Sequence, residues 1–334
     1  MFNRTIVQLI PSMRAKSGGP VNVVRSIKHV MDRININNEV IETQERWFSS
    51  GTKFFSNISN IYFSHCIWDI KSFTYIILGN NSYIFSHGML SRKAFGRNKY
   101  KKRIFSKLFY LLVQIRRVTV IFGSQSEFDE AIFQPKNHLI LPNPVKPIVD
   151  SSHSAIMKNR TGKIKFVYFS RFDKRKGLSE LISAFDAVSP DNAEFHILGL
   201  ISDTDYENSI KNLTKNKPNV VIHENCTGVE ARKIMQKCDI ICLWSQFEGQ
   251  PMSVLEGVSD GLLPLVSPNC NLPFETMSYF GLQTFTSVTD LPKIIEYFCA
   301  FDRNSLEKLR KDYQSTIDLN ELLNQRFERF LRNL

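Results

Sequence analysis

Residues 239–268 read DIICLWSQFEGQPMSVLEGVSDGLLPLVSP and give the clearest indication of the fold. The apolar run Ile240–Trp244 predicts a strand that is buried on both faces. A loop containing Glu248 follows it. A helix is then expected over Pro251–Gly261, because proline favours the first position of a helix and glycine the position after its end. A second apolar run, Leu262–Val266, predicts the next strand, and this order is the βαβ unit of a parallel sheet.

Two carboxylates of this stretch lie where such sheets bind ligands, which is outside the carboxyl ends of the strands and at helix N-termini. Glu248 is in the loop, and Glu256 is about one turn inside the helix. Both can accept hydrogen bonds from hydroxyl groups, while backbone N–H groups at the helix start face an anionic group. A sugar nucleotide offers both features. By their spacing alone, the two side chains are also compatible with solvated positions on a loop and a helix.

The pattern Glu248-x7-Glu256, followed by Gly261 and Pro264, resembles the E-x7-E signature of the retaining glycosyltransferases of family 4. These enzymes have the α/β GT-B fold, in which two Rossmann-like domains face each other across a cleft. The resemblance implies transfer of a sugar from a nucleotide-sugar donor, with a UDP-sugar favoured and with retention of anomeric configuration. It implies that Glu248 is catalytic and grips the donor sugar, and that Glu256 bonds the ribose hydroxyls. It extends the donor contacts to Gln250, Pro251, Met252, Ser253 and Val254.

Length and composition indicate the class of protein. A chain of 334 residues favours two domains over one. No run of eighteen or more apolar residues predicts a membrane span, and the short run Ile6–Ile10, which ends at Pro11, predicts a first strand rather than a secretory signal. The six cysteines show no CxxC spacing and no histidine partner at zinc-ligand spacing, so buried thiols in a reducing cytosol are expected.

The net charge of +11 is unevenly distributed. Residues 1–150 contain 21 Lys and Arg against 9 Asp and Glu, a charge of +12, whereas the remainder contains 22 against 23. No acidic residue occurs between Asp69 and Glu127. This asymmetry predicts an anionic partner for the first half of the chain.

Ten of these basic residues fall between Arg92 and Arg117, interleaved with apolar residues at helical spacing. A basic amphipathic helix of this kind can lie on anionic lipid. Alternatively, its apolar side packs on a sheet and its Lys and Arg are merely solvated; the two interpretations are compatible. Nucleic acid is disfavoured as a partner, because no zinc-finger, RNP-like or helix-turn-helix signature is present.

Two motifs of the first half suggest a ligand-facing edge. After the first strand, Ser17-Gly18-Gly19-Pro20 precedes a helical pattern, and a glycine-bearing loop there lets backbone amides approach a phosphate or sugar, although it can also be an ordinary turn. Its place resembles the donor-facing loop of the family. The strand-like segment 82–90 ends in Ser86-His87-Gly88-Met89-Leu90, which resembles the PHGML segment of some family 4 enzymes with Ser86 in place of proline. The resemblance implies a catalytic His87, contacting the donor sugar or moving a proton; a local structural hydrogen bond is the alternative.

The second half opens with a predicted strand, Ile164–Phe169, followed by Ser170-Arg171-Phe172-Asp173-Lys174-Arg175-Lys176-Gly177. Two cations beside a helix N-terminus suit a diphosphate without a metal ion. The segment resembles the SR-x4-KG motif of the family, which implies that Arg171 and Lys176 neutralise the leaving diphosphate. No cofactor or metal is expected. Asp203-Thr204-Asp205 spells the DxD of another transferase fold, but it is expected in a polar loop and is interpreted as chance.

The remaining pattern completes the domain prediction. Residues 1–145 are expected to form an acceptor-binding domain, residues 146–312 a nucleotide-sugar domain, and residues 313–334 a helix that crosses back to the first domain. The segment LPNPV at 141–145 resembles the IPNGV of the family, with Pro144 in place of glycine, and residues 151–163 are the expected linker. Helices are also expected at 124–133, 178–188, 229–237, 291–301 and 319–334, and strands at 60–65, 118–122, 194–198 and 220–223.

The expected role is therefore assembly of a bacterial surface polysaccharide, such as O-antigen or capsule, by a cytoplasmic enzyme at the inner face of the cell membrane. The expected acceptor is a saccharide or a polyprenyl-diphosphate-linked saccharide, and the basic first domain favours the lipid-linked form. No nucleic acid partner is expected. Two other functions remain open at this point. One is a GT-B epimerase or hydrolase of nucleotide sugars, and the other is a non-catalytic saccharide-binding homologue.

Overall fold

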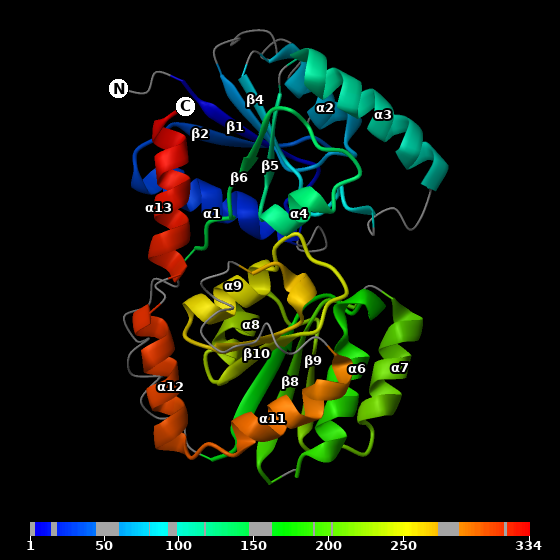
Figure 1. The fold of residues 1–334 in the computed structure, drawn as a ribbon, viewed down its shortest axis with the longest axis vertical. Helices are drawn as coiled ribbons and strands as arrows, with labels where there is room; N and C mark the ends of the chain where they lie inside the picture. The colour runs from blue at the N-terminus through cyan, green and yellow to red at the C-terminus, as the bar shows by residue number, and fades with distance from the viewer. Residues whose placement is uncertain are drawn as a thin grey trace. The chain divides into compact units, whose positions relative to one another are not determined.

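A computed structural model of the chain describes residues 4–14, 19–44, 60–79, 81–92, 99–116, 118–146, 162–189, 191–201, 203–272, 287–316 and 319–334. The chain divides into two compact units (Figure 1). The first consists of Met1–Lys146 together with Leu323–Leu334, and the second of Pro147–Leu322. Each contains one sheet in which the paired strands run parallel.

The first unit is built on a six-stranded sheet in the order β2-β1-β3-β4-β5-β6. Its strands are β1 (Ile6–Ile10), β2 (Asn38–Glu42), β3 (Ile61–Ser64), β4 (Asn81–Phe85), β5 (Thr119–Phe122) and β6 (His138–Ile140). Its helices are α1 (Gly19–Arg33), α2 (Ile70–Leu78), α3 (Lys99–Arg116) and α4 (Gln125–Asp129). Figure 1 shows α2 and α3 on one side of this sheet and α1 on the other. The sheet is therefore covered on both faces, as the buried parallel strands require.

The C-terminal helix α13 (Leu319–Arg332) completes the first unit. Its Phe327 ring lies 6.3 Å from the ring of Phe85, and its Phe330 ring lies 6.0 Å from that of Phe63. The Asn324 amide forms two hydrogen bonds with the backbone of Val145, of 3.0 and 3.1 Å. The last dozen residues thus cover strands made from the first quarter of the chain.

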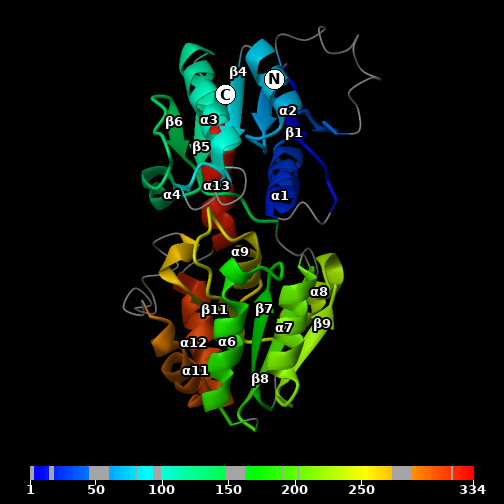
Figure 2. The same ribbon diagram turned by 90° about the vertical axis from the view of Figure 1, so that its right-hand side faces the viewer.

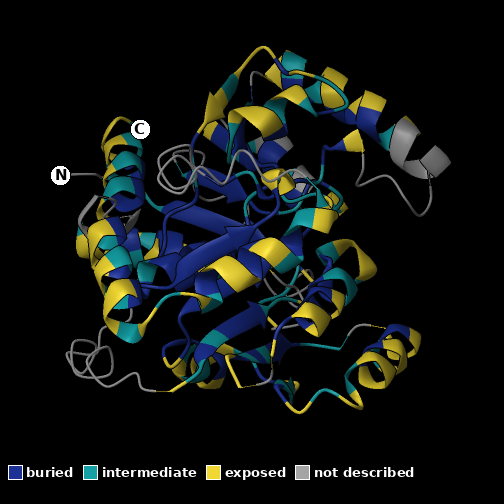
Figure 3. Ribbon diagram, turned by 60° about the horizontal axis from the view of Figure 1, so that its bottom comes forward, coloured by how far each residue is buried: buried dark blue, intermediate teal, exposed yellow. Residues whose placement is uncertain are grey.

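The second unit is built on a five-stranded sheet in the order β11-β10-β7-β8-β9. Its strands are β7 (Ile164–Phe169), β8 (Ala193–Gly199), β9 (Val220–Glu224), β10 (Ile240–Leu243) and β11 (Leu263–Val266). Its helices are α6 (Leu178–Ala184), α7 (Thr204–Thr214), α8 (Gly228–Met235), α9 (Met252–Ser259), α11 (Leu291–Cys299) and α12 (Arg303–Thr316), with a 3-10 turn η3 (Lys174–Lys176) after β7. Helices α6 and α7 pack side by side (Figure 2). Strands β1, β3, β10 and β11 are buried along their whole length, whereas β2, β6 and β9 are partly exposed. The helices keep exposed outer faces (Figure 3).

The βαβ unit predicted from residues 239–268 is present as β10, α9 and β11, and the predicted α/β class with two parallel-sheet domains is confirmed. Helix α9 lies close to β10, because a Cβ added at Gly257 would come within 2.8 Å of the Ile241 side chain. Glycine at this position therefore sets the distance between helix and sheet.

Two sequence predictions were wrong in detail. The helix expected at 124–133 is the single turn of α4, which ends at Asp129, although the Ser124 hydroxyl does cap it by accepting the Glu127 N–H at 3.1 Å. The polar loop expected around residues 203–205 is the start of α7. Asp203 is its N-cap, and its carboxylate accepts the N–H groups of Asp205 and Tyr206. The Asp-Thr-Asp sequence is thus a helix cap.

Candidate functional site

The loop after β7 is held by Asp173, which precedes the η3 turn. Its carboxylate accepts the Arg175 N–H at 3.0 Å and binds the Arg175 guanidinium through Nε and a terminal nitrogen. The hydrogen bond from Arg175 lowers the pKa of Asp173 to about 2, so this carboxylate is charged at neutral pH. Arg175 is therefore engaged within the loop itself, and Lys176 is the next cation along the turn.

The loop after β10 is fastened to the same turn. The Ser245 hydroxyl and the Gln246 N–H both lie within hydrogen-bond distance of the Arg175 carbonyl oxygen, at 3.1 and 2.8 Å. Further along, the Glu248 N–H donates to the Asn269 carbonyl at 3.0 Å, and the Asn271 amide donates to the Glu248 carbonyl at 2.5 Å. The backbone of Glu248 is thereby fixed on both sides by the segment that follows β11.

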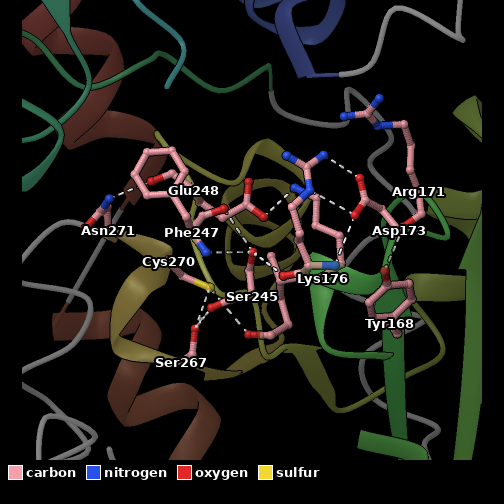
Figure 4. Close-up of polar contacts among 12 residues, drawn as sticks. Tyr168, Arg171, Asp173, Lys176, Ser245, Phe247, Glu248, Ser267, Cys270 and Asn271 are labelled. Atoms are coloured by element: carbon pink, nitrogen blue, oxygen red, sulfur yellow. Dashed lines mark hydrogen bonds and ion pairs between the residues drawn. The ribbon is translucent and has the colours of Figure 1, made fainter. Parts of the chain in front are cut away.

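These contacts bring Lys176 and Glu248 together as an ion pair between the Lys176 ammonium and the Glu248 carboxylate. Figure 4 shows the two side chains pointing toward each other. The side chains keep 16% and 11% of their surface exposed, so each charge is largely shielded but remains accessible from one side. A fixed ammonium can bind phosphate oxygens, and a fixed carboxylate can accept hydrogen bonds from sugar hydroxyls.

Helix α9 begins directly after this loop. Pro251 is its N-cap in extended conformation, and no side chain caps it. Met252 and Val254 are buried, and the Val254 N–H donates to the Pro251 carbonyl at 3.1 Å, whereas Ser253 and Gln250 are partly exposed. The first turn of a helix has N–H groups without intrahelical partners, and these favour anions. Glu256 follows one turn later and is buried.

Arg171 occupies the other side of the η3 loop and is exposed. Its carbonyl accepts a hydrogen bond of 2.9 Å from the Tyr168 hydroxyl. Burial raises the pKa of Tyr168 well above its ordinary value, so this hydroxyl stays protonated and keeps donating. The backbone of Arg171 is fixed, while its side chain faces solvent, five residues before Lys176.

Two more predicted residues belong to the first unit. Gly19 is the first residue of α1, and no atom lies within 4 Å of a Cβ built on it, while Gly18 lies outside the described residues. His87 follows the carboxyl end of β4 with a φ of 44°, in the left-handed region that few non-glycine residues adopt. Its Nε2 lies 3.0 Å from Nδ1 of the buried His65. Burial lowers the pKa of His87 to about 4, so its ring is neutral at neutral pH.

The loop that carries His87 is held by a buried carboxylate, Glu127. This carboxylate accepts the Ser86 hydroxyl at 2.5 Å, the Gly88 N–H, and the Gly123 N–H at 2.7 Å. Burial raises the pKa of Glu127, and the three hydrogen bonds lower it by less, so the net shift is upward. The serine at position 86 therefore has a structural role that proline could not fill, because its hydroxyl donates a hydrogen bond to Glu127.

Several of these supporting residues were missed by sequence reasoning. Asp173, Ser245 and Asn271 fix the Lys176–Glu248 pair through loop contacts that leave no periodic signal. Two others, His65 beside His87 and its own partner Gln8, could have been found from the sequence. Gln8 is the polar residue within the first apolar run, and His65 ends the predicted strand at 60–65.

Among the described residues, no group of three or more His, Cys, Asp or Glu side chains is arranged to hold a metal ion. Within the same part of the chain, no helix is long and apolar enough to cross a membrane.

Comparison with known proteins shows what this part of the chain resembles. Residues 150–278, which include the η3 loop, the Glu248 loop and α9, match the family model of group 1 glycosyl transferases. A search of the curated proteins found no match.

Solved structures resemble the chain over nearly its whole length. HepE of Anabaena in complex with UDP-glucose matches with a TM-score of 0.71 at 15% identity, covering 99% of this chain and all of that one. Sucrose-phosphate synthase of Thermosynechococcus elongatus matches with a TM-score of 0.72 at 13% identity, covering 99% of both chains. WaaG, a glycosyltransferase involved in lipopolysaccharide biosynthesis, matches with a TM-score of 0.66 at 13% identity, covering 97% of this chain and 98% of that one. The chain has the GT-B fold, and its residues 150–278 match the group 1 glycosyl transferases.

Proposed function

We propose that the protein transfers a sugar from a nucleotide-sugar donor to a saccharide acceptor with retention of configuration at the anomeric carbon. The Lys176–Glu248 pair carries this proposal, because it fixes a phosphate-binding cation beside a sugar-binding carboxylate at the carboxyl ends of β7 and β10. The pair lies within the segment that matches the group 1 glycosyl transferases. HepE, which shares the fold, is described in complex with UDP-glucose, and this supports a UDP-sugar as the first donor to test.

In this mechanism Lys176 and Arg171 hold the diphosphate of the donor. Breaking the bond between the anomeric carbon and the diphosphate leaves negative charge on the departing oxygen, and cations already in place stabilise that charge without reorganising. The Lys176 ammonium has three N–H donors, so it can keep one bond to Glu248 while binding phosphate oxygens. In this proposal Lys176 and Arg171 neutralise the diphosphate, and no metal ion is assigned that role.

The carboxylates hold the two sugars of the donor. Glu248 accepts hydrogen bonds from the transferred sugar, and Glu256 accepts them from the ribose. The open N–H groups at the first turn of α9, at Met252 and Ser253, add dipolar stabilisation of anionic groups. The departing diphosphate takes the proton of the acceptor hydroxyl.

The test combines a donor panel with a matched set of variants. Nucleotide sugars are screened by thermal shift, and release of nucleotide is then measured with and without saccharide acceptors. We expect Lys176→Ala and Glu248→Gln to lower turnover about 10²- to 10³-fold, the effect of removing a preorganised charge or hydrogen bond. Lys174→Ala is the control, because Lys174 lies in the same η3 turn and is exposed. Folding is checked by circular dichroism, since each single change leaves a partly buried charge without its partner.

Other outcomes identify other functions. Nucleotide release that is independent of any acceptor indicates a hydrolase, and a changed sugar in the recovered donor indicates an epimerase. Binding of saccharide without nucleotide release, unaffected by Glu248→Gln, indicates a non-catalytic homologue. Wild-type turnover in both Lys176→Ala and Glu248→Gln rejects the assigned site.

For the acceptor, we propose a lipid-linked saccharide reached at an anionic membrane surface, on the evidence of α3. Phe109 and Val113 of this helix are buried against its sheet. A second apolar line, spaced by four, three and four residues, faces outward: Ile104, Leu108, Leu111 and Ile115 are 74%, 52%, 55% and 64% exposed. The segment contains no acidic residue, and basic residues accompany this line. An apolar stripe with flanking cations suits the headgroup region of an anionic bilayer. On this basis we propose that the enzyme acts at the inner face of the membrane in polysaccharide assembly.

Vesicle flotation tests this membrane contact. We expect binding to vesicles that contain phosphatidylglycerol, weaker binding as salt rises, and loss of binding in the double variant Leu108→Ser, Leu111→Ser. Leu213→Ser is the control, because Leu213 is also an exposed leucine but lies on α7 of the second unit. Equal flotation of the double variant and the wild type rejects the stripe as the contact. Loss of a wild-type dimer in the double variant, without flotation of either, shows instead that a second copy covers it.

A further inference from the structure

A chain of polar side chains crosses three neighbouring strands of the first unit at their carboxyl ends. Gln8 lies in β1, His65 directly follows β3, and His87 follows β4 by two residues. The strands are adjacent and parallel, and Gln8 pairs with Phe63, which pairs with Tyr83. Alternation of side chains therefore directs Gln8 and His65 to the same face, and the contact with His65 brings His87 to it. Gln8 and His65 are completely buried.

The hydrogen bonds that link these side chains run without a break from α1 to His87. The Gln8 amide nitrogen lies 3.3 Å from the Val24 carbonyl oxygen of α1. The Gln8 amide oxygen lies 3.1 Å from His65 Nε2. His65 Nδ1 lies 3.0 Å from His87 Nε2.

Only one direction of donation satisfies every group. The Val24 carbonyl can only accept, so the Gln8 amide must present its NH₂ to it and its oxygen to His65. His65 Nε2 must then carry the proton. Burial lowers the pKa of His65 well below its ordinary value, and the neighbouring His87 lowers it further. The His65 ring is therefore neutral, and its Nδ1 can only accept a hydrogen bond. His87 Nε2 must therefore donate.

We propose that Gln8 and His65 are positioning residues that fix neutral His87 in the tautomer with its proton on Nε2, so that Nδ1 presents a permanent hydrogen-bond acceptor. His87 can then accept a hydrogen bond from a saccharide hydroxyl, but it cannot donate one through the same atom. This inference rests on the proposed function only for the identity of that saccharide. The tautomer follows from the geometry of the first unit.

The surroundings of His87 hold the ring as well as the proton. Its ring is nearly parallel to those of His65 and Phe85, with centroids 5.3 and 5.9 Å away. Its backbone is kept at positive φ between Ser86 and Gly88, both bound to Glu127. A ring that is fixed in orientation and tautomer presents its Nδ1 lone pair in one direction.

Nitrogen-15 NMR of the full chain labelled at histidine tests the tautomer without any substrate. We expect a protonated Nε2 and an unprotonated Nδ1 on His87 from about pH 6 to pH 8, because its pKa lies below this window. In His65→Phe, which removes the acceptor but fills the space, we expect the Nδ1–H tautomer of His87 to appear. A protonated Nδ1 on His87 in the wild type overturns the proposal, and so does an unchanged tautomer in His65→Phe.

The activity of His65 variants distinguishes a positioning role of this residue from a packing role. His65→Asn retains an amide oxygen near the place of Nδ1 but leaves a void, whereas His65→Phe fills the void without an acceptor. With UDP-glucose, or the donor found by the panel, we expect His65→Phe to lower kcat about ten- to hundredfold with little change in the donor KM, and His65→Asn to retain more activity. The opposite order assigns His65 a packing role alone. If the wild type transfers no sugar while the tautomer is as stated, only the proposed function fails.

Discussion

Gly177 is the residue whose replacement most directly tests how the Lys176 turn is held. It has a φ of 67°, and a Cβ added there would collide with the backbone carbonyl oxygen of Trp244. Gly228 has nearly the same backbone conformation, with a φ of 62°, but no atom lies within 4 Å of its Cβ position. Comparing alanine at the two positions therefore separates the collision from the backbone strain.

The expected magnitudes follow from these two contributions. An alanine in the left-handed region costs about 1–2 kcal/mol at either position. The collision adds about 1–3 kcal/mol at Gly177 alone, the usual cost of overpacking a fixed environment. We therefore expect Gly228→Ala to lower the free energy of unfolding by about 1–2 kcal/mol and Gly177→Ala by about 2–5 kcal/mol.

Urea denaturation measures the difference. Trp244 contacts the substituted position and is buried, so its fluorescence reports unfolding of the second unit. Because Gly177 directly follows Lys176, we also expect Gly177→Ala to reduce nucleotide release more than Gly228→Ala does. Equal destabilisation by the two variants would refute the collision, and full turnover in Gly177→Ala would refute the dependence of Lys176 on this turn.

Two further predictions concern the first unit. Burial depresses the pKa of His87 from 6.5 to about 4 and that of His65 in the same direction, so the unfolded chain binds more protons between these pH values. The free energy of unfolding should fall as pH drops from about 6.5 toward 4; urea midpoints measure this, and an unchanged slope in His65→Phe would contradict it. Glu127→Gln turns an acceptor into a donor opposite the Ser86 and glycine donors, so it should cost about 1–3 kcal/mol in the same assay. Asp129→Asn, on the exposed side of α4, should lower the free energy of unfolding far less. Equal losses in the two variants would contradict the role of Glu127 in holding the loop that carries His87.

The fold was predictable where burial on both faces of a sheet leaves an unbroken apolar run. This holds for β10 and β11, whose residues are all apolar and buried. It fails for β2, an edge strand whose sequence Asn-Glu-Val-Ile-Glu is only partly buried. It also fails for α7, because only Tyr206 and Ile210 of this polar helix are buried, too few to give a helical pattern.

The candidate site was predictable only as separate pieces. Motif positions placed Lys176 and Glu248 after strands, but strand order in the sheet makes those strands neighbours, and the sequence does not encode that order locally. The same reason hid the partner of His87. His65 lies 22 residues earlier and reaches it only because β3 and β4 pair.

The return of α13 to the first unit has a consequence for biosynthesis. Phe63 and Phe85 precede the second unit in the sequence, whereas their partners Phe330 and Phe327 follow it, so the second unit is translated between them. The part of the first sheet that α13 covers therefore stays without this helix until the second unit has been translated. We expect a chain truncated before Asn324 to lose these aromatic contacts and the hydrogen bonds to Val145, so that a change late in the sequence destabilises the unit that is synthesised first.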